Sequence, residues 1–363
     1  MLSISPTYFY NKPNVNFKCY SGFTDVQAGG KKQRVNNYTT FFRDFKTLDF
    51  TKNYILKNFP NGTKIAEFGC STGQKPYSLM ILLEEQNKDR KYKCTGYDFP
   101  EVLKISKETP LFGLNQYTKE EEILFDVYNH SELFGKKIVT PQKAQEYRDT
   151  FFKYFSEYKP EKTITSARYK YLKKFVEENK DKTPDEIKKA KEDLFYFDLI
   201  SRTTKVVKAN EKAKELVDFV PGNIKDIDKI LKPKENGVVI FQNALYHILS
   251  KNDLDYEIQD LKKNVDEGAK LFKKINRVLP LNGIFVLGTL PSDHIYDYEC
   301  EKDSHLAYQN DRQIRVYDSS PIHKALRENG FEPVFYEETP DNTAYVDYKD
   351  IHLPSVWKKV REA

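Results

Sequence analysis

The chain has 363 residues, of which 39% are hydrophobic and 31% are charged, and its formal net charge is +5. This length provides one large domain or two modest ones with a sizeable buried core. Lysines alternate with acidic residues along the chain, which favours solvated helix faces over a concentrated basic stripe. We therefore predict no nucleic-acid partner.

Cysteine, histidine and apolar patterns exclude further classes of protein. The four cysteines show no CxxC spacing and the six histidines are scattered, so we predict free thiols and no metal site. The first residues lack a basic segment followed by an apolar run, and no stretch approaches ~18 apolar residues. The expected protein does not span a membrane and is cytoplasmic.

The first third of the chain predicts a βαβ unit. A short apolar run at 63–68 stops at Gly69 and is typical of a buried strand. A helical period begins at Lys75 and ends near Gln86, and a second strand is predicted at 92–98. Units of this length join parallel strands, so the fold class is α/β.

Other segments divide the chain into three parts. We predict an extended lead-in at 1–35, an α/β domain formed by 36–115 and 215–363, and a charged helical insertion at 116–214 that is a candidate lid or partner-binding module. Within these parts we expect short helices at 37–59, helices at 167–176 and from Thr183 onward, strands at 237–241 and 284–288, helices at 253–278 and 321–329, and a terminal antiparallel pair at 333–336 and 344–347.

The main chemical signal is the sequence Glu-Phe-Gly-Cys-Ser-Thr-Gly at 67–73, where the first strand meets the next helix. Sheets of this class bind nucleotide-like ligands at such turns, because glycine lets a ligand approach the backbone closely. The spacing of Gly69 and Gly73 matches neither the dinucleotide fingerprint nor a phosphate-binding P-loop. It suits a ligand without phosphates, such as S-adenosylmethionine.

Polar residues also end the neighbouring strands. Asp98 closes the second strand, where a carboxylate can accept hydrogen bonds from two ribose hydroxyls. Asn243 follows the strand at 237–241, and an amide there can bond an adenine edge or an amino-acid group. An asparagine such as Asn223, taken alone, is more often a loop cap than a ligand-binding residue. Both roles, cap and ligand contact, therefore stay open for it.

Two long, ungapped motifs resemble the CheR-type chemotaxis receptor methyltransferases, which methylate protein glutamate side chains. Residues 37–44 are similar to that family's N-x-T-x-F-F-R-[DE] signature, and residues 70–78 to its [AC]-S-T-G-E-E-P-Y-S motif. Weaker matches follow in the same order at 97–98, 217–224, 242–243 and 279–283.

The resemblance implies a doubly wound, Rossmann-like class I methyltransferase that uses S-adenosylmethionine and transfers a methyl group to a carboxyl oxygen of a glutamate-bearing protein. The candidate cofactor-binding residues, from the motifs and the glycine turn together, are Asn37, Thr39, Arg43, Glu67, Gly69, Ser71, Gly73, Gln74, Asp98, Asn223, Ile224, Gln242 and Asn243. The candidate catalytic residues are Arg43, which would hold the acceptor carboxylate, and Tyr246 and His247, which would orient it. A carboxylate acceptor is ionised at neutral pH and needs no general base.

This sequence differs from the family at the cofactor's expected amino-acid end. Gln74 and Lys75 stand where the family has two glutamates, and Gln242 stands where it has arginine. Two alternatives are therefore a methyltransferase acting on small molecules or other proteins, and a non-catalytic cofactor-binding scaffold. Methylation of nucleic-acid bases is disfavoured, because residues 241–244 do not form the [DNS]-P-P-[YF] arrangement.

Overall fold

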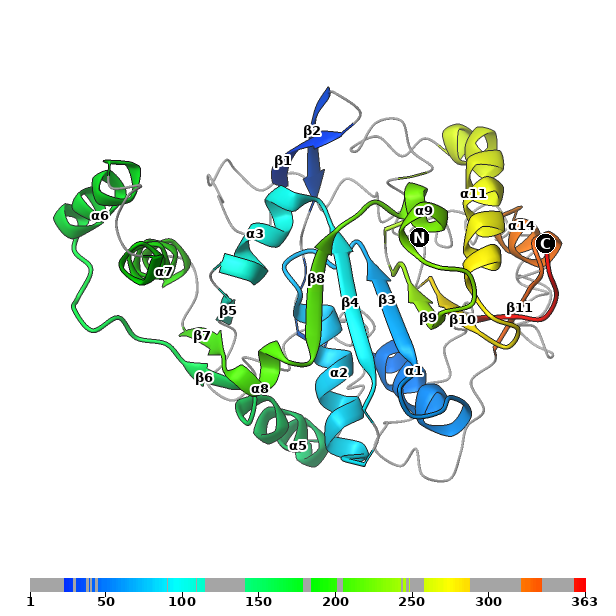
Figure 1. The fold of residues 1–363 in the computed structure, drawn as a ribbon, viewed down its shortest axis with the longest axis horizontal. Helices are drawn as coiled ribbons and strands as arrows, with labels where there is room; N and C mark the ends of the chain where they lie inside the picture. Colours follow the sequence, from blue (N-terminus) through cyan, green and yellow to red (C-terminus); the bar gives the residue numbers. More distant parts are fainter. Residues whose placement is uncertain are drawn as a thin grey trace, which may run out of the picture.

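The computed structural model describes residues 23–28, 31–36, 39, 41–42, 45–89, 91–108, 110–114, 141–178, 184–200, 205–242, 244–245, 248, 258–287, 321–334 and 356–363. Its centre is a seven-stranded sheet (Figure 1). In spatial order the strands are β11 (Phe331–Pro333), β12 (Val356–Lys359), β10 (Ile284–Val286), β9 (Asn236–Ile240), β3 (Lys64–Phe68), β4 (Lys93–Asp98) and β8 (Val217–Pro221). Strand β12 runs antiparallel to both its neighbours, and the other adjacent pairs are parallel.

Helices cover both faces of this sheet. They are α1 (Phe45–Asn58), α2 (Gln74–Gln86), α3 (Pro100–Glu108), the short η2 (Ile224–Asp226) and α9 (Ile227–Ile230), α11 (Ile258–Val278) and α14 (Pro321–Glu328). Alternate residues of β3 define the two layers. Ile65 belongs to the apolar cluster that includes α1 and α2, whereas Ala66 and Phe68 belong to the cluster that includes α9, α11 and α14. Burial on both sides is typical of parallel strands in α/β proteins.

The strand order reverses next to β3. The chain continues from β3 to β4 and β8 on one side, and later returns to β9 and β10 on the other side. Ligands of doubly wound sheets bind in the crevice at the carboxyl ends of the strands at this switch point. The predicted strands at 63–68, 92–98, 237–241 and 284–288 are confirmed, and they place the glycine turn and Asp98 at this edge.

Two sequence-based expectations about the ends of the chain need correction. Part of the expected lead-in forms an antiparallel hairpin of β1 (Phe23–Ala28) and β2 (Lys31–Asn36). The sequence Gly-Gly between these strands is a hairpin signal that a search for long periods overlooks. Within the described residues, the strand near 333 is β11, and it pairs with β12 at 356–359, a strand that was not predicted. Residues 344–347 lie outside the described part of the chain.

The expected helical insertion also contains a small sheet. Its helices are α5 (Pro141–Phe152), α6 (Ser166–Glu178), α7 (Pro184–Ile200) and α8 (Glu211–Lys214). The strands β6 (Phe155–Glu157) and β7 (Lys205–Ala209) pair antiparallel, and β5 (Leu111–Leu114) pairs with the other edge of β7. These strands are short and far apart in sequence, so local patterns did not reveal them. Helices α6 and α7 lie at the far left of Figure 1, away from the central sheet.

An aromatic cluster joins the base of the insertion to the sheet domain. The ring of Phe41 lies 5.3 Å from that of Phe112, 4.7 Å from that of Phe151 and 4.9 Å from that of Phe155. Tyr77 of α2 meets the Phe155 ring edge-on at 5.5 Å. Such edge-to-face pairs add about 0.5–1.5 kcal/mol each beyond the burial of apolar area. Phe41, within the motif at 37–44, is thus buried between α2 and the insertion.

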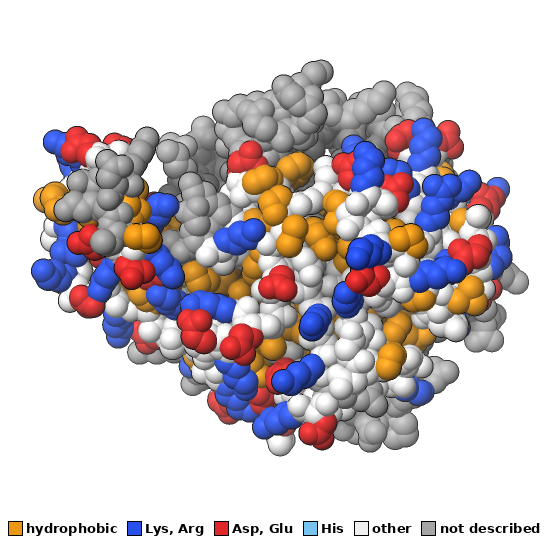
Figure 2. Space-filling view, in the orientation of Figure 1, with side chains coloured by type: hydrophobic (Ala, Val, Ile, Leu, Met, Phe, Trp, Pro, Cys, Tyr) orange, Lys and Arg blue, Asp and Glu red, His pale blue; other side chains and the backbone are white. Residues whose placement is uncertain are grey.

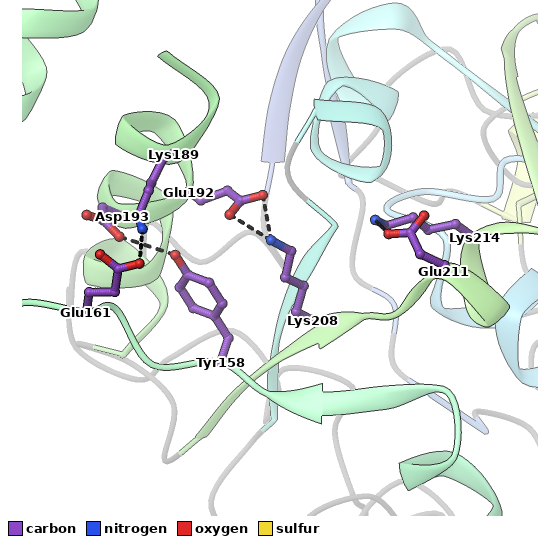
Figure 3. A network of polar contacts seen from close by, with 8 residues as sticks. All are labelled: Tyr158, Glu161, Lys189, Glu192, Asp193, Lys208, Glu211 and Lys214. Carbon is purple, nitrogen blue, oxygen red and sulfur yellow. Dashed lines mark hydrogen bonds and ion pairs between the residues drawn. The ribbon is translucent and has the colours of Figure 1, made fainter. Parts of the chain in front are cut away.

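An ion pair and a hydrogen bond attach α7 to the small sheet and to the residue after β6 (Figure 3). Lys208 of β7 donates hydrogen bonds to both carboxylate oxygens of Glu192, at 2.9 and 2.8 Å. Beside this pair, the hydroxyl of Tyr158 donates to Asp193 at 3.2 Å. The side chain of Glu192 is only 7% exposed and that of Lys208 is 30% exposed, so the pair is largely desolvated.

We expect Lys208→Met to loosen α7, because it leaves the buried Glu192 carboxylate without its ammonium partner. A loss of about 1–3 kcal/mol of local stability is expected, measured as faster amide hydrogen exchange in α7. Lys174→Met is the matched control, because the Lys174–Glu178 pair is exposed and contributes about 0.5 kcal/mol or less. Equal exchange in the two variants would contradict this account of the insertion.

Charges of both signs are interspersed over the visible face of the molecule (Figure 2). None of the described helices combines the length and apolar character needed to cross a bilayer. The described residues also contain no group of three or more histidine, cysteine or acidic side chains placed to hold a metal ion.

Candidate functional site

The turn between β3 and α2 is folded against the end of β4. Gly69 donates from its backbone nitrogen to the carbonyl of Tyr97 at 2.9 Å, and the nitrogen of Ser71 donates to Oδ2 of Asp98 at 2.7 Å. Gly69, Ser71 and Gly73 have φ angles of 64°, 54° and 97°. Positive φ is where glycine is most favoured, which explains the two glycines of the motif. The structure thus brings the predicted glycine turn and Asp98 together.

The Asp98 carboxylate is a partly buried acceptor at the carboxyl end of β4. Its other oxygen, Oδ1, accepts a hydrogen bond from the backbone nitrogen of Phe99 at 2.8 Å. Burial raises the pKa of Asp98 to about 6, and the two backbone donors oppose this rise. Each oxygen of a carboxylate has about two acceptor sites. Asp98 therefore keeps acceptor capacity for two further donors, such as a pair of ribose hydroxyls.

A second polar group lies between β3 and β9. Glu67 of β3 is only 3% exposed. Burial raises the pKa of its carboxyl group to about 7, and the nearby Lys75 ammonium opposes the rise. Lys75 Nζ donates to the main-chain carbonyl of Gln242, just beyond β9, at 3.3 Å. A small cavity is lined by these three residues together with Leu48, Thr51, Ser78, Leu79, Ile240 and Val286.

The raised pKa of Glu67 has a consequence for stability. Folding favours the protonated Glu67 carboxyl group over the ionised one. The folded state therefore has the full stabilisation from this group below the ordinary pKa of 4.5, and loses it as the pH rises through about 7. We expect Glu67→Gln, which is neutral at every pH, to be about 3 kcal/mol more stable than the native protein at pH 8 and no more stable at pH 4. Urea unfolding across this pH range measures the difference.

Glu235→Gln is the control for this prediction. The side-chain hydrogen bond from Lys64 lowers the pKa of this exposed carboxyl group, so the sign of its pH effect is reversed. A stability difference between native protein and Glu67→Gln that does not change with pH would contradict the burial argument.

The motif at 37–44 contributes a buried hydroxyl group. Thr39 is 6% exposed, and within the described structure its Oγ1 has no hydrogen-bond partner. The next described residues pack against α2, where the backbone nitrogen of Phe42 donates to Ser78 Oγ at 2.9 Å. A buried hydroxyl without a partner is unfavourable, and a bound polar ligand would relieve this penalty.

Three other predicted residues have structural roles. Asn223 caps η2, because its side-chain oxygen accepts from the backbone nitrogen of Lys225 at 3.0 Å. Ile224 is 4% exposed and belongs to the apolar cluster with Phe68. The side-chain oxygen of Gln74 accepts from the hydroxyl of Thr72 within the glycine turn. Any contact of these residues with a ligand stays a prediction.

Some predicted residues lie outside the described part of the chain: Asn37, Arg43, Asn243, Tyr246 and His247. Thr51 of α1 lines the small cavity and was not predicted from the sequence. Its Oγ1 is buried and has no hydrogen-bond partner in the described structure. A threonine in an amphipathic helix carries no motif, so only the folded structure could reveal that it lines this cavity.

These groups fit the parts of S-adenosylmethionine. The ligand has a ribose with two hydroxyls, no phosphate, and an amino-acid end with both charges. Asp98 can accept from the hydroxyls, and the positive-φ turn allows close approach to its backbone. Lys75 supplies a positive charge near Glu67, whose carboxyl group has a pKa raised to about 7 by burial. Gly69 also lies close to the segment after β9, since a Cβ there would be 3.4 Å from that of Ala244. The residues present are therefore compatible with this cofactor.

The strand order, the single antiparallel strand and the glycine turn next to Asp98 define the class I methyltransferase form of the Rossmann-like α/β fold. A family model described as "CheR methyltransferase, SAM binding domain" matches residues 37–108. Over residues 37–108, the match confirms the resemblance to CheR-type methyltransferases that the motifs indicated. The matched segment is described as the S-adenosylmethionine-binding part of that family, which supports S-adenosylmethionine as the cofactor.

Solved structures give more distant similarities. A protein of Methanococcus maripaludis described as an S-adenosyl-L-methionine-dependent methyltransferase aligns with 9% identity and a TM-score of 0.31, over 87% of this chain and 86% of its own. Phosphoethanolamine N-methyltransferase 2 of Haemonchus contortus aligns with 11% identity and a TM-score of 0.30, over 82% of this chain and 39% of its own. A Nostoc punctiforme protein described as an O-methyltransferase aligns with 10% identity and a TM-score of 0.26, over 67% and 37%.

This chain therefore spans well under half the length of the Haemonchus and Nostoc proteins. The TM-scores are low, so the fold assignment depends on strand order and on the family match. Among curated proteins, none matches the sequence.

Proposed function

We propose that this protein binds S-adenosylmethionine at the edge formed by β3, β4 and β9, and transfers its methyl group to the carboxylate of a protein glutamate side chain. The main observation is the hydrogen bond from the Ser71 nitrogen to Asp98, which joins the glycine turn to an acidic strand end within the segment that matches CheR. The glutamate acceptor is proposed from the motif at 37–44 and from the chemistry below.

Methyl transfer to an ionised carboxylate requires no proton-transfer group in the protein. The cofactor supplies a methyl group on a sulfonium, and the carboxylate oxygen forms the new C–O bond as the C–S bond breaks and its electron pair stays on sulfur. A glutamate acceptor is already ionised at neutral pH, so no general base is needed. The two charges neutralise each other in the transition state, so exclusion of water and alignment of the reacting atoms accelerate the step.

Different residues of this chain would bind the cofactor, bind the acceptor and select the acceptor protein. Asp98 and the turn at 69–73 would hold the nucleoside, and Arg43 would hold the acceptor carboxylate with two parallel hydrogen bonds. Tyr246 and His247 would orient that carboxylate. The insertion, with its separate helices α6 and α7, would select the acceptor protein. We propose a cytoplasmic location, where the cofactor and ionised protein side chains are both present.

Calorimetry followed by labelling tests this proposal. The full chain should bind S-adenosylmethionine, and incubation with the methyl-labelled cofactor and a cell extract should label protein. Alkali should release that label as methanol, because carboxyl esters hydrolyse whereas N-methyl groups do not. Label in a metabolite would overturn the protein acceptor, and alkali-stable label would overturn the carboxyl acceptor. Failure to bind either the cofactor or S-adenosylhomocysteine would favour a scaffold without catalytic activity.

A further inference from the structure

Phe42 has a backbone conformation that is unusual for an aromatic residue. Its φ angle is 55°, in the left-handed region, where the Cβ atom of a side chain crowds the following carbonyl oxygen. A bulky residue keeps such a conformation only where the surrounding structure holds it, and residues of this kind concentrate at functional sites. The packing around Phe42 must therefore offset the cost of its backbone conformation.

Residues of two helices hold Phe42 in this conformation. From α2, the Ser78 hydroxyl accepts a hydrogen bond from the Phe42 backbone nitrogen at 2.9 Å. From α5, the Tyr147 ring lies 5.6 Å from the Phe42 ring, and the Phe151 ring lies 6.3 Å from it. Phe42 is 0% exposed, so packing against the protein fixes its ring in place.

The two aromatic residues of α5 belong to the insertion, yet they face the sheet domain. Tyr147 and Phe151 are four residues apart, so they lie on one face of the helix. Tyr147 is 5% exposed, and its hydroxyl donates a long hydrogen bond to Asp49 of α1 at 3.5 Å. Phe151 also meets the ring of Phe41 edge-on at 4.7 Å. The insertion thus contacts two consecutive residues of the motif at 37–44.

The residue that follows Phe42 in the chain is Arg43, the proposed ligand of the acceptor carboxylate. The backbone angles of Phe42 set the direction in which the chain continues, so a change in them displaces the backbone of the next residue. A guanidinium makes two parallel hydrogen bonds with a carboxylate only when the two groups are aligned. A displacement of about 1 Å can slow a reaction about a hundredfold. The contacts of Phe42 are therefore placed to affect the rate of methyl transfer.

We propose that Phe42 is a positioning residue for the acceptor, and that Tyr147 of the insertion acts through it. The aromatic rings of α5 fix the left-handed backbone of Phe42, and that backbone sets where Arg43 begins. This inference rests on the proposed function. It gives α5 a part in methyl transfer that is separate from the proposed choice of acceptor protein by α6 and α7.

Tyr147→Leu tests this role, because it removes the ring that packs on Phe42 and keeps an apolar side chain. The measurement is the rate of alkali-labile methyl transfer to protein in a cell extract at saturating S-adenosylmethionine. This rate should fall about tenfold, whereas cofactor affinity measured by calorimetry should stay within about twofold. Tyr147→Phe should keep most of the native rate, because it keeps the ring and loses only the long hydrogen bond to Asp49.

A second substitution at Arg43 shows whether the effect passes through that residue. In an Arg43→Lys background, Tyr147→Leu should slow transfer about twofold or less, because lysine cannot make two parallel hydrogen bonds and depends less on alignment. Circular dichroism establishes that each variant is folded, and Phe42→Gly is the independent variant if Tyr147→Leu unfolds. Glycine adopts positive φ freely but also adopts other conformations, so the rate of Phe42→Gly should again fall about tenfold.

Phe331→Leu is the matched control, because it removes a buried ring from β11, at the far edge of the central sheet. It should leave the rate within about twofold. A native rate in Tyr147→Leu, an equal loss in Phe331→Leu, or the same loss in both Arg43 backgrounds would overturn this inference alone. A parallel loss of cofactor affinity would overturn it too, because Tyr147 would then act on the cofactor pocket. Absence of alkali-labile label on protein with the native enzyme would overturn the proposed function, and the inference with it.

Discussion

Asp98→Ala is expected to weaken binding of S-adenosylmethionine about a hundredfold or more. The substitution removes the acceptor for the ribose hydroxyls and frees the Ser71 nitrogen that Asp98 now holds at 2.7 Å. Two hydrogen bonds to a charged group contribute about 1.5–3 kcal/mol each, and 1.4 kcal/mol is a factor of about ten. Calorimetry with the native protein and the variant measures the loss.

Asp218→Ala is the control for this substitution. Asp218 lies on the adjacent strand β8 and its side chain is exposed, so the same chemical change there should leave cofactor affinity within about twofold. Retention of native affinity by Asp98→Ala would show that the ribose is held elsewhere and would remove the main support for the site.

The raised pKa of Asp98 predicts a pH dependence of the same binding. Because that pKa is about 6, the carboxyl group becomes protonated as the pH falls through 6 and loses acceptor capacity. Affinity of the native protein should therefore fall below pH 6, by up to about tenfold per pH unit if only the ionised form binds. Asp98→Asn should bind weakly and without this dependence.

The second large effect is expected on stability, from Gly73→Ala. Gly73 has a φ of 97°, and a Cβ there would lie 2.6 Å from Cζ and 2.9 Å from Cε1 of Phe219. A positive φ costs a non-glycine residue about 1–2 kcal/mol, and overpacking adds about 1–3 kcal/mol. We expect a loss of about 2–4 kcal/mol in the free energy of unfolding, measured with urea.

Gly62→Ala separates these two causes. Gly62 also has a positive φ of 83°, but a Cβ there would meet nothing within 4 Å. Gly62→Ala should therefore lower the free energy of unfolding by only the cost of the positive φ, about 1 kcal/mol. Phe219→Leu should partly rescue Gly73→Ala, because it shortens the side chain that collides. Equal losses at the two glycines would mean that Phe219 moves away without penalty.

Much of the sheet domain was predictable because its signals are local. The apolar run at 63–68, the glycine turn and the helical period after Lys75 each lie within one short segment, and all three have the predicted structure. The parallel pairing of β3 with β4 followed from the length of the unit between them.

The errors lie where distant segments pair. The partner of β11 is β12 at the end of the chain, and the small sheet in the insertion joins β5 to β7 across about ninety residues. Short strands with non-local partners leave a weak local pattern, so neither pairing could be read from periodicity.

By itself, the sequence determined the class of protein. The signals were the glycine turn, the acidic strand end and the two long motifs. Each is a contiguous pattern that requires particular residues at particular backbone positions. Only the tertiary structure decided how the charged residues are arranged. Lys75 reaches Gln242 across 167 positions of sequence, and the raised pKa of Glu67 arises from burial between layers of the folded protein. The physical reason is that burial and the proximity of charges depend on which segments pack together, and local residue patterns do not encode that.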